Sequence, residues 1–149
     1  MSLMVKDVMS QNEITIDCSA SVKQAAELMD KYDIGCLIVL KEGKPAGIVT
    51  ERDMLRRVLL QFKDPETTNV SEVMSGPLIS SNPQTSMREA MGLLNERRIK
   101  RLPVVDGDAV VGLLSMTDIV RSVAFLEHMA NSLCARCELS RNASGRIQE

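Results

Sequence analysis

The stretch Gly47-Ile48-Val49-Thr50-Glu51-Arg52-Asp53 returns 65 positions later as Gly112-Leu113-Leu114-Ser115-Met116-Thr117-Asp118. Each stretch begins with a glycine, continues as a short apolar run, and ends with a hydroxyl residue followed three positions later by an aspartate. This pattern predicts a strand that passes directly into a helix, with the hydroxyl residue as the N-cap. The first turn of such a helix has N–H groups without intrahelical partners, so an anion or a sugar could bind there.

The repeat extends along most of the chain at the same shift and without a gap. The segment Val5-Lys6-Asp7-Val8-Met9 corresponds to Val70-Ser71-Glu72-Val73-Met74, and the match continues to Val58 and Val123. Self-similarity at a fixed period indicates a tandem duplication. We divide the chain into a first repeat at 5–62, a polar linker at 63–69, a second repeat at 70–127, and a C-terminal tail at 128–149 that we expect to be flexible.

Composition excludes several classes of protein. The net charge of −2, from 18 basic and 20 acidic residues, gives no support for a nucleic-acid partner. No apolar run approaches the roughly 18 residues of a membrane span, and no charged-then-apolar leader opens the sequence. We therefore expect a cytoplasmic protein without membrane contact, in which the four cysteines are free thiols.

Each repeat predicts the order β-α-β-β-α. In the first repeat we expect strands at 14–16, 36–40 and 46–49, a helix after the capping box that begins at Ser21, and a closing helix over 51–62. In the second repeat we expect strands at 78–80, 102–105 and 110–114, a helix after the capping box that begins at Ser86, and a closing helix over 116–129. One repeat is about 60 residues, which is marginal for a core of its own. The predicted fold is therefore α/β of the α+β type, with two sheets packed against each other about a pseudo-twofold axis.

The order of elements and the motifs resemble the cystathionine-β-synthase (CBS) domain pair, also called a Bateman module. The two Val-to-Met segments, the two Gly-to-Asp stretches and Arg101-Leu102-Pro103-Val104-Val105-Asp106 carry the resemblance, which covers about residues 4 to 127. It implies a stand-alone regulatory module that binds an adenine ligand, namely AMP, ADP, ATP, S-adenosylmethionine or NAD(H), in the cleft between the repeats. It also implies a homodimer whose conformational or oligomeric change is read by a regulated protein that the sequence does not identify.

The resemblance assigns a ligand role to two sets of residues. In CBS pairs that bind adenine nucleotides, the aspartate of each stretch usually holds the ribose hydroxyls, and the hydroxyl residue before it lies near the ribose or phosphate. The adenine is commonly held beside the segments 34–36 and 99–101. In the first repeat the implied nucleotide-binding residues are Thr15, Ile34, Gly35, Cys36, Thr50, Arg52 and Asp53. In the second repeat they are Ser80, Ile99, Lys100, Arg101, Pro103, Ser115, Thr117 and Asp118.

Each of these residues also has a purely structural interpretation. A Ser or Thr N-cap with an aspartate at N3 stabilises a helix by roughly 0.5–2 kcal/mol without any ligand, and both roles are compatible. Arg52 lies in a first turn, where the helix dipole disfavours a cation, so a bound phosphate would offset that cost; an exposed arginine near an acid is the alternative. Ile34 and Ile99 could simply pack in the core. If all of these roles are structural, the module serves only for dimerisation.

Two further features leave their roles open. Arg97, Arg98, Lys100 and Arg101 form either a solvated helix end or a phosphate-facing wall of the second site, whereas the equivalent segment 32–36 has no cation. In the tail, Cys134 and Cys137 have the spacing of half a zinc knuckle, and His128 would add a third ligand of the four that zinc needs. The alternatives are a redox pair or two free thiols, so we assign no metal site.

The sequence gives little support for an enzyme. His128 is the only histidine, so there is no Ser-His-Asp or Cys-His arrangement to propose. Neither a Walker loop nor a G-x-G-x-x-G motif is present. We expect a binding module without catalytic residues and without a cofactor other than the adenine ligand.

Overall fold

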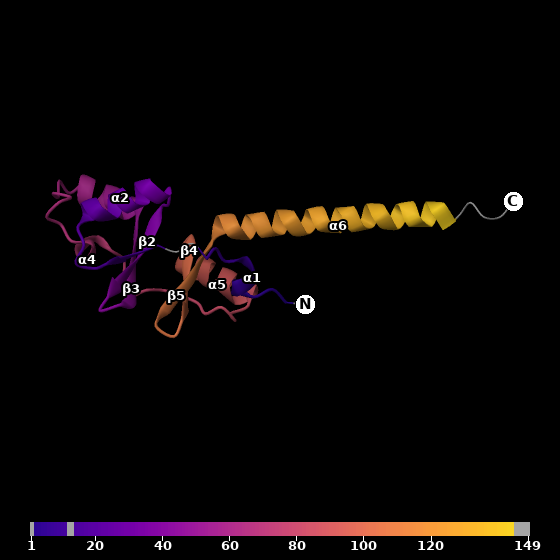
Figure 1. Ribbon diagram of the computed structural model, residues 1–149, viewed down its shortest axis with the longest axis horizontal. Coiled ribbons are helices and arrows are strands. Elements are labelled where there is room, and N and C mark those ends of the chain that lie inside the picture. Colours follow the sequence, from indigo (N-terminus) through magenta and orange to yellow (C-terminus); the bar gives the residue numbers. More distant parts are fainter. Residues whose placement is uncertain (1, 12–13, 145–149) are drawn as a thin grey trace.

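The computed structural model describes residues 2–11 and 14–144, with side chains up to residue 132. Two β-hairpins form the centre of a mixed α/β body, helices flank them, and the last helix projects away from the body (Figure 1). The two hairpins contact each other through β3 (Lys44–Thr50) and β5 (Ala109–Ser115). The predicted fold class and the packing of one repeat against the other are confirmed. No helix among the described residues is long and apolar enough to span a membrane.

The first repeat follows the predicted order closely. Its elements are α1 (Val5–Val8), β1 (Thr15–Asp17), α2 (Val22–Tyr32), β2 (Cys36–Lys41), β3, and α3 (Glu51–Met54), which passes into a π-helix, η1 (Leu55–Leu59). β1 pairs in parallel with β2, and β2 pairs antiparallel with β3. The closing helix was expected to reach residue 62, but it ends at η1 because Phe62 takes a left-handed conformation with φ of 55°.

The second repeat lacks one predicted strand. Its elements are α4 (Val70–Val73), α5 (Met87–Arg97), β4 (Arg101–Asp106), β5, and α6 (Met116–Ser144). The strand expected at 78–80 is wrong, because the only pairing there is a single bridge between Ser81 and Val104. Pro77 and Pro83 bracket this segment and cannot donate to a ladder, and its serines favour a strand less than the Thr-Ile pair of β1 does.

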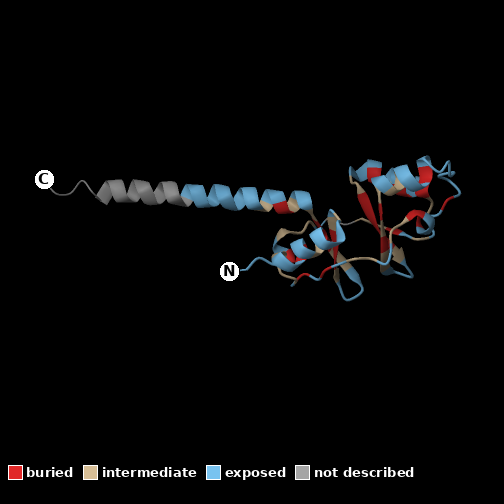
Figure 2. Ribbon diagram, turned by 180° about the vertical axis from the view of Figure 1, so that it is seen from behind, coloured by how far each residue is buried: buried red, intermediate tan, exposed pale blue. Residues whose placement is uncertain are grey.

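The last helix is much longer than predicted. It was expected to end near residue 129 and to give way to a flexible tail, but α6 continues to Ser144. No glycine or proline occurs between Met116 and Ser144, and Gly145 follows directly, so nothing in the sequence breaks the helix earlier. Most described residues of α6 beyond its first turns are exposed (Figure 2).

Each repeat donates its first short helix to the core of the other repeat. Val5 of α1 is fully buried in the cluster formed by Leu102, Val104 and other residues of the second repeat. Val70 of α4 is fully buried in the corresponding cluster of the first repeat. The hydrogen bonds match: the Val5 N–H donates to the Thr85 carbonyl and the Val70 N–H to the Ala20 carbonyl, both at 2.8 Å. The two repeats therefore share their cores.

Gly47 and Gly112 let the exchanged segments approach the hairpins. A Cβ at Gly47 would lie 2.6 Å from the Ser75 carbonyl oxygen, and a Cβ at Gly112 would lie 2.8 Å from the Ser10 carbonyl oxygen. Both distances are shorter than van der Waals contact, so a side chain at either position would push the exchanged segment away from the strand. The glycine that begins each repeated stretch is thus needed for contact between the repeats.

Candidate ligand-binding site

The two strand-to-helix junctions are complete capping boxes. In the first, Oδ2 of Asp53 accepts the Thr50 N–H at 2.9 Å, and the Thr50 hydroxyl accepts the Asp53 N–H at 3.2 Å. In the second, Oδ2 of Asp118 accepts the Ser115 N–H at 3.0 Å and the Ser115 hydroxyl at 2.7 Å. The capping interpretation is confirmed, and in both boxes one carboxylate oxygen makes all of the capping bonds.

The second carboxylate oxygen differs between the junctions. Oδ1 of Asp53 lies 3.9 Å from Nε of Arg57, one turn further along the helix. The residue equivalent to Arg57 is Ser122, whose hydroxyl instead donates to the Ile119 carbonyl at 2.7 Å. Within the described part of the chain no donor bonds Oδ1 of Asp118, so this oxygen is available to a ligand hydroxyl.

A cavity of about 360 Å³ lies between the repeats and contains Asp118. This volume is at the lower end of the range for small-molecule sites. The first repeat supplies Ser10, Ile14, Asp33, Ile34, Gly35, Cys36 and Ile38, and the second repeat supplies Arg101, Leu113, Ser115, Thr117, Asp118 and Arg121. Two carboxylates, three hydroxyls and two guanidinium groups thus line the cavity together with apolar side chains, which is an arrangement suited to a small ligand with both an apolar ring and polar groups.

The strand ends position the walls of this cavity. Arg101 pairs with Ser115 at the end of the β4–β5 hairpin, and Cys36 pairs with Thr50 at the equivalent end of the β2–β3 hairpin. A Cβ at Gly35 would lie 2.5 Å from Nη2 of Arg101. Gly35 therefore leaves room for the Arg101 guanidinium, and the two hairpins meet at this end.

The Cys36 thiol, which lines the cavity, has a perturbed pKa. Burial raises its pKa because a thiolate would lose hydration there; the Arg101 guanidinium lowers it and the Glu51 carboxylate raises it. The net effect is a raised pKa, so Cys36 is a neutral thiol at neutral pH. It contributes a small apolar surface to the cavity rather than a nucleophile.

From the sequence, one set of nucleotide-binding residues was assigned to each repeat, but the structure brings residues of both sets together in one cavity. Ile34, Gly35 and Cys36 of the first set share the cavity with Arg101, Ser115, Thr117 and Asp118 of the second set. Thr15 instead pairs with Ile38 in the sheet, and Pro103 is buried in the core. Ser80 lines a separate, open groove beside α5. These three residues lie outside the cavity.

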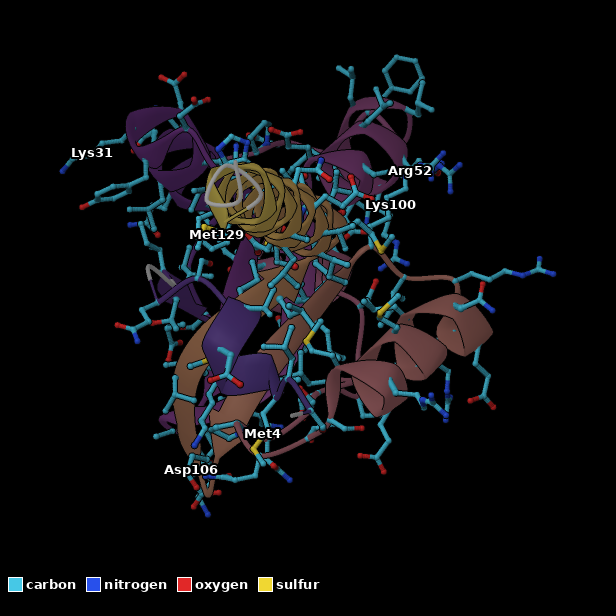
Figure 3. The ribbon with its side chains drawn as sticks, turned by 90° about the vertical axis from the view of Figure 1, so that its right-hand side faces the viewer. Met4, Lys31, Arg52, Lys100, Asp106 and Met129 are labelled. Carbon is cyan, nitrogen blue, oxygen red and sulfur yellow. The ribbon has the colours of Figure 1, made fainter. Side chains whose placement is uncertain are left out.

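The remaining predicted residues also do not line the cavity. Thr50 and Asp53 form the first junction, and Arg52 is exposed beside them. Ile99 and Lys100 line a pocket of about 560 Å³ between α5 and α6 that also includes Arg98. In the view along α6, Arg52 and Lys100 lie on one side of the body and Lys31 lies on the other (Figure 3).

Comparisons with known proteins decide the family. A family model described as the CBS domain matches residues 5–60 and 70–124. The chain belongs to the CBS-domain family. It is 36% identical over 115 residues to the CBS domain-containing protein YhcV of Bacillus subtilis, covering 77% of this chain and 81% of that protein. A CBS pair is in general a regulatory module.

Of two other matches, one is to a longer protein and one is to a protein of known assembly. The mitochondrial CBS domain-containing protein CBSX3 of Arabidopsis thaliana is 35% identical over 108 residues, which cover 69% of this chain but only 52% of that protein. The structure of a hexameric CBS-CP12 protein from bloom-forming cyanobacteria matches with a TM-score of 0.75 and 33% identity, covering 94% of this chain and 85% of that chain. Self-association therefore occurs among proteins with this fold.

Sequence reasoning missed several residues of the cavity of this CBS pair. Arg121 follows Asp118 by three positions in a helix, so its place on the same face was predictable from spacing. Ser10 lines the cavity because its backbone forms two hydrogen bonds with the backbone of Leu113, at 2.9 and 3.0 Å. This pairing follows from the packing of the N-terminal segment of the first repeat against the second repeat. Asp33 directly precedes the predicted segment 34–36. From the sequence we noted only that the segment 32–36 has no cation, and Asp33 was given no role.

The tail hypothesis remains partly outside the described side chains. His128 is exposed on α6, and the side chains of Cys134 and Cys137 lie beyond residue 132. Among the residues whose placement is described, no group of three potential metal ligands comes together. A zinc or redox role for the tail stays a prediction that metal analysis of protein purified without chelator would test.

Proposed function

We propose that this CBS pair binds an adenine-containing ligand in the cavity between its repeats and transmits its occupancy through a change in packing. The candidates are AMP, ADP, ATP, S-adenosylmethionine and NAD(H). The observation that carries the proposal is the position of Asp118: one carboxylate oxygen is fixed by the cap, and the other is left for a ribose. A carboxylate oriented in this way is preorganised to accept a hydrogen bond from a vicinal diol.

The remaining walls of the cavity support the same ligand class. Ile14, Ile34 and Ile38 provide an apolar surface for a base, and Gly35, which has no side chain, lets the Arg101 guanidinium lie at the same end of the cavity. Arg101 and Arg121 provide positive charge for a phosphate. Binding would alter the relation between the repeats only if the ligand favours one arrangement over another, and residues of both repeats line the cavity.

We also propose that the protein forms a homodimer through its exposed helical surface. Met91 of α5 and Met116, Val120 and Val123 of α6 are between 45% and 63% exposed, which is unusual for large apolar side chains grouped on two helices. Sedimentation analysis of Val120→Glu against wild type tests this. A dimeric wild type and a monomeric variant are expected, and a monomeric wild type would contradict the proposal.

Calorimetric titration with each candidate ligand tests the function. We expect at least one adenine ligand to bind the wild type and Asp118→Asn to weaken it at least about tenfold, because the variant loses the charged acceptor. Glu89→Gln is the matched control, since Glu89 makes the same kind of capping bond at Ser86, outside the cavity. Equal weakening in both variants, or no binding to the wild type, would favour the alternative of a ligand-free dimerisation module.

A further inference from the structure

The charges of the cavity differ from those at the equivalent positions of the other half. The charged residues that line the cavity are Asp33, Arg101, Asp118 and Arg121, which sum to zero. A shift of 65 exchanges Asp33 with Arg98, Gly35 with Lys100 and Thr117 with Arg52. Apart from Arg101, which lines the cavity itself, the equivalent positions of the other half therefore hold four cations, Arg52, Arg56, Arg98 and Lys100, against the single acid Asp53. The two halves have the same backbone plan, but the charged residues of the cavity sum to zero whereas those at the equivalent positions sum to a positive charge.

Asp33 is held at the cavity by the end of α2. It takes the left-handed conformation of a C-cap, with φ of 50° and ψ of 51°, and the Ile34 N–H behind it donates to the Met29 carbonyl at 3.0 Å. The C-terminal end of a helix carries partial negative charge, so a carboxylate there makes this wall more negative still. Arg98 caps α5 in the same conformation, with φ of 54° and ψ of 40°, and has the favourable charge for that position.

The field of this wall acts on any ligand in the cavity, whichever way the ligand lies. A cavity of about 360 Å³ is about one Debye length across at physiological salt, so the exposed Asp33 carboxylate is close enough to act on a bound anion, and added salt should weaken this effect. Asp118 adds a second negative charge, so the two acids already balance Arg101 and Arg121, and the cavity has no net positive charge to offset a phosphate. Each added phosphate therefore increases the repulsion from Asp33 and Asp118 without gaining a further cation.

We propose that the cavity selects an adenine ligand with at most one phosphate, such as AMP or S-adenosylmethionine, and that Asp33 sets this limit. This inference rests on the adenine-ligand function proposed above. It makes Asp33 a specificity-determining residue, and it assigns ligands with more phosphates to the cationic half around Asp53.

The two ligands to compare are AMP and ATP, each titrated calorimetrically into the same set of variants. All proteins carry Asp53→Asn, which weakens the opposite half so that the cavity dominates. With Asp33 present we expect AMP to bind at least about tenfold more tightly than ATP. Asp33→Arg should narrow the ratio of AMP affinity to ATP affinity by about tenfold, mainly by strengthening ATP binding. Arg98 shows that an arginine fits this backbone conformation. The ratio should also narrow as salt is raised.

Asp30→Arg is the control, because Asp30 lies on the same helix, is exposed, changes charge by the same amount and does not line the cavity. An equal change in ratio for Asp30→Arg and Asp33→Arg, or ATP binding as tightly as AMP when Asp33 is present, would overturn the selection by Asp33 while leaving the adenine function standing. Binding of neither ligand, nor of S-adenosylmethionine, to the protein with wild-type sequence would overturn the function and this inference together.

Discussion

The two repeats have the same plan, yet each junction between strand and helix is built into different surroundings. Around the first junction, Arg57 reaches from η1 and donates to the Val73 and Met74 carbonyls, both at 2.9 Å, so it fixes the exchanged helix α4. Around the second junction, Ser122 takes the place of Arg57, and α6 continues far out of the body. The duplication therefore preserved the caps and the cores, and it left the contacts around them free to diverge.

The comparison shows that two positions with equivalent backbone structure in the two repeats can still hold side chains of different chemistry. Leu37 and Leu102 are equivalent and both fully buried. Cys36 and Arg101 are equivalent too, but one is a buried neutral thiol and the other a guanidinium in the cavity. A residue that faces a core must keep its size and apolar character, because the core is closely packed. A residue where the repeats meet can change its chemistry together with the groups that it contacts.

The largest effect should come from the shared cores. Leu37→Ala and Leu102→Ala should each lower the free energy of unfolding by about 2–5 kcal/mol. Because each core contains a helix of the other repeat, both variants should unfold in one transition in chemical denaturation. Leu60→Ala, at a side chain 61% exposed, is the control. Two separate transitions would show that the repeats fold independently.

A smaller effect is expected where the exchanged segments cross the hairpins. Gly47→Ala and Gly112→Ala should each destabilise the protein by about 1–3 kcal/mol, because the new methyl group would overlap the Ser75 or Ser10 carbonyl oxygen. Gly92→Ala places a methyl group in open space on α5 and should instead stabilise by about 0.5–1 kcal/mol. Thermal unfolding of the three variants measures these changes in stability. Unchanged stability in Gly47→Ala and Gly112→Ala would mean that the exchanged segments do not pack closely against the hairpins.

The difference between the two exchanged helices depends on Arg57. Arg57→Ala should cost about 1.5 kcal/mol, because two carbonyls at the end of α4 lose a charged donor. Hydrogen exchange should rise at α4 and stay unchanged at α1, which has no such contact from Ser122. Arg56→Ala, at an exposed neighbour, controls for charge. Equal exchange at both helices in the variant would contradict this role.

The smallest effect concerns the strand that the second repeat lacks. Ser81 occupies the place of Ile16, and its buried hydroxyl has no hydrogen-bond partner among the described residues. Ser81→Ala should therefore stabilise the protein by about 1 kcal/mol, because it removes an unsatisfied polar group. Ser80→Ala, at an exposed position, should change stability by less than about 0.5 kcal/mol. A loss of stability in Ser81→Ala would show that the hydroxyl has a partner in solution.

The sequence predicted what depends on local pattern. The Thr50–Asp53 and Ser115–Asp118 caps, the hairpins and the helices α2 and α5 follow from spacing within a few residues, and all are present. The family also followed, because its motifs occur twice at a constant shift. These features need no knowledge of which distant segments meet.

The remainder depends on distant contacts. A shift of 65 aligns Val5 with Val70 but does not show that each packs into the other repeat. For the same reason the predicted site residues were grouped by repeat, while the cavity combines Gly35 with Asp118. The length of α6 was readable from its lack of glycine and proline, but the Cys-x-x-Cys spacing drew the interpretation toward a flexible tail.

The most direct test of the central claim is a crystal structure of the protein grown with AMP. The account predicts AMP in the cavity, with a ribose hydroxyl bonded to Oδ1 of Asp118 and the base beside Ile34 and Gly35. AMP held at another surface without contact to Asp118, or an empty cavity at saturating AMP, would contradict it.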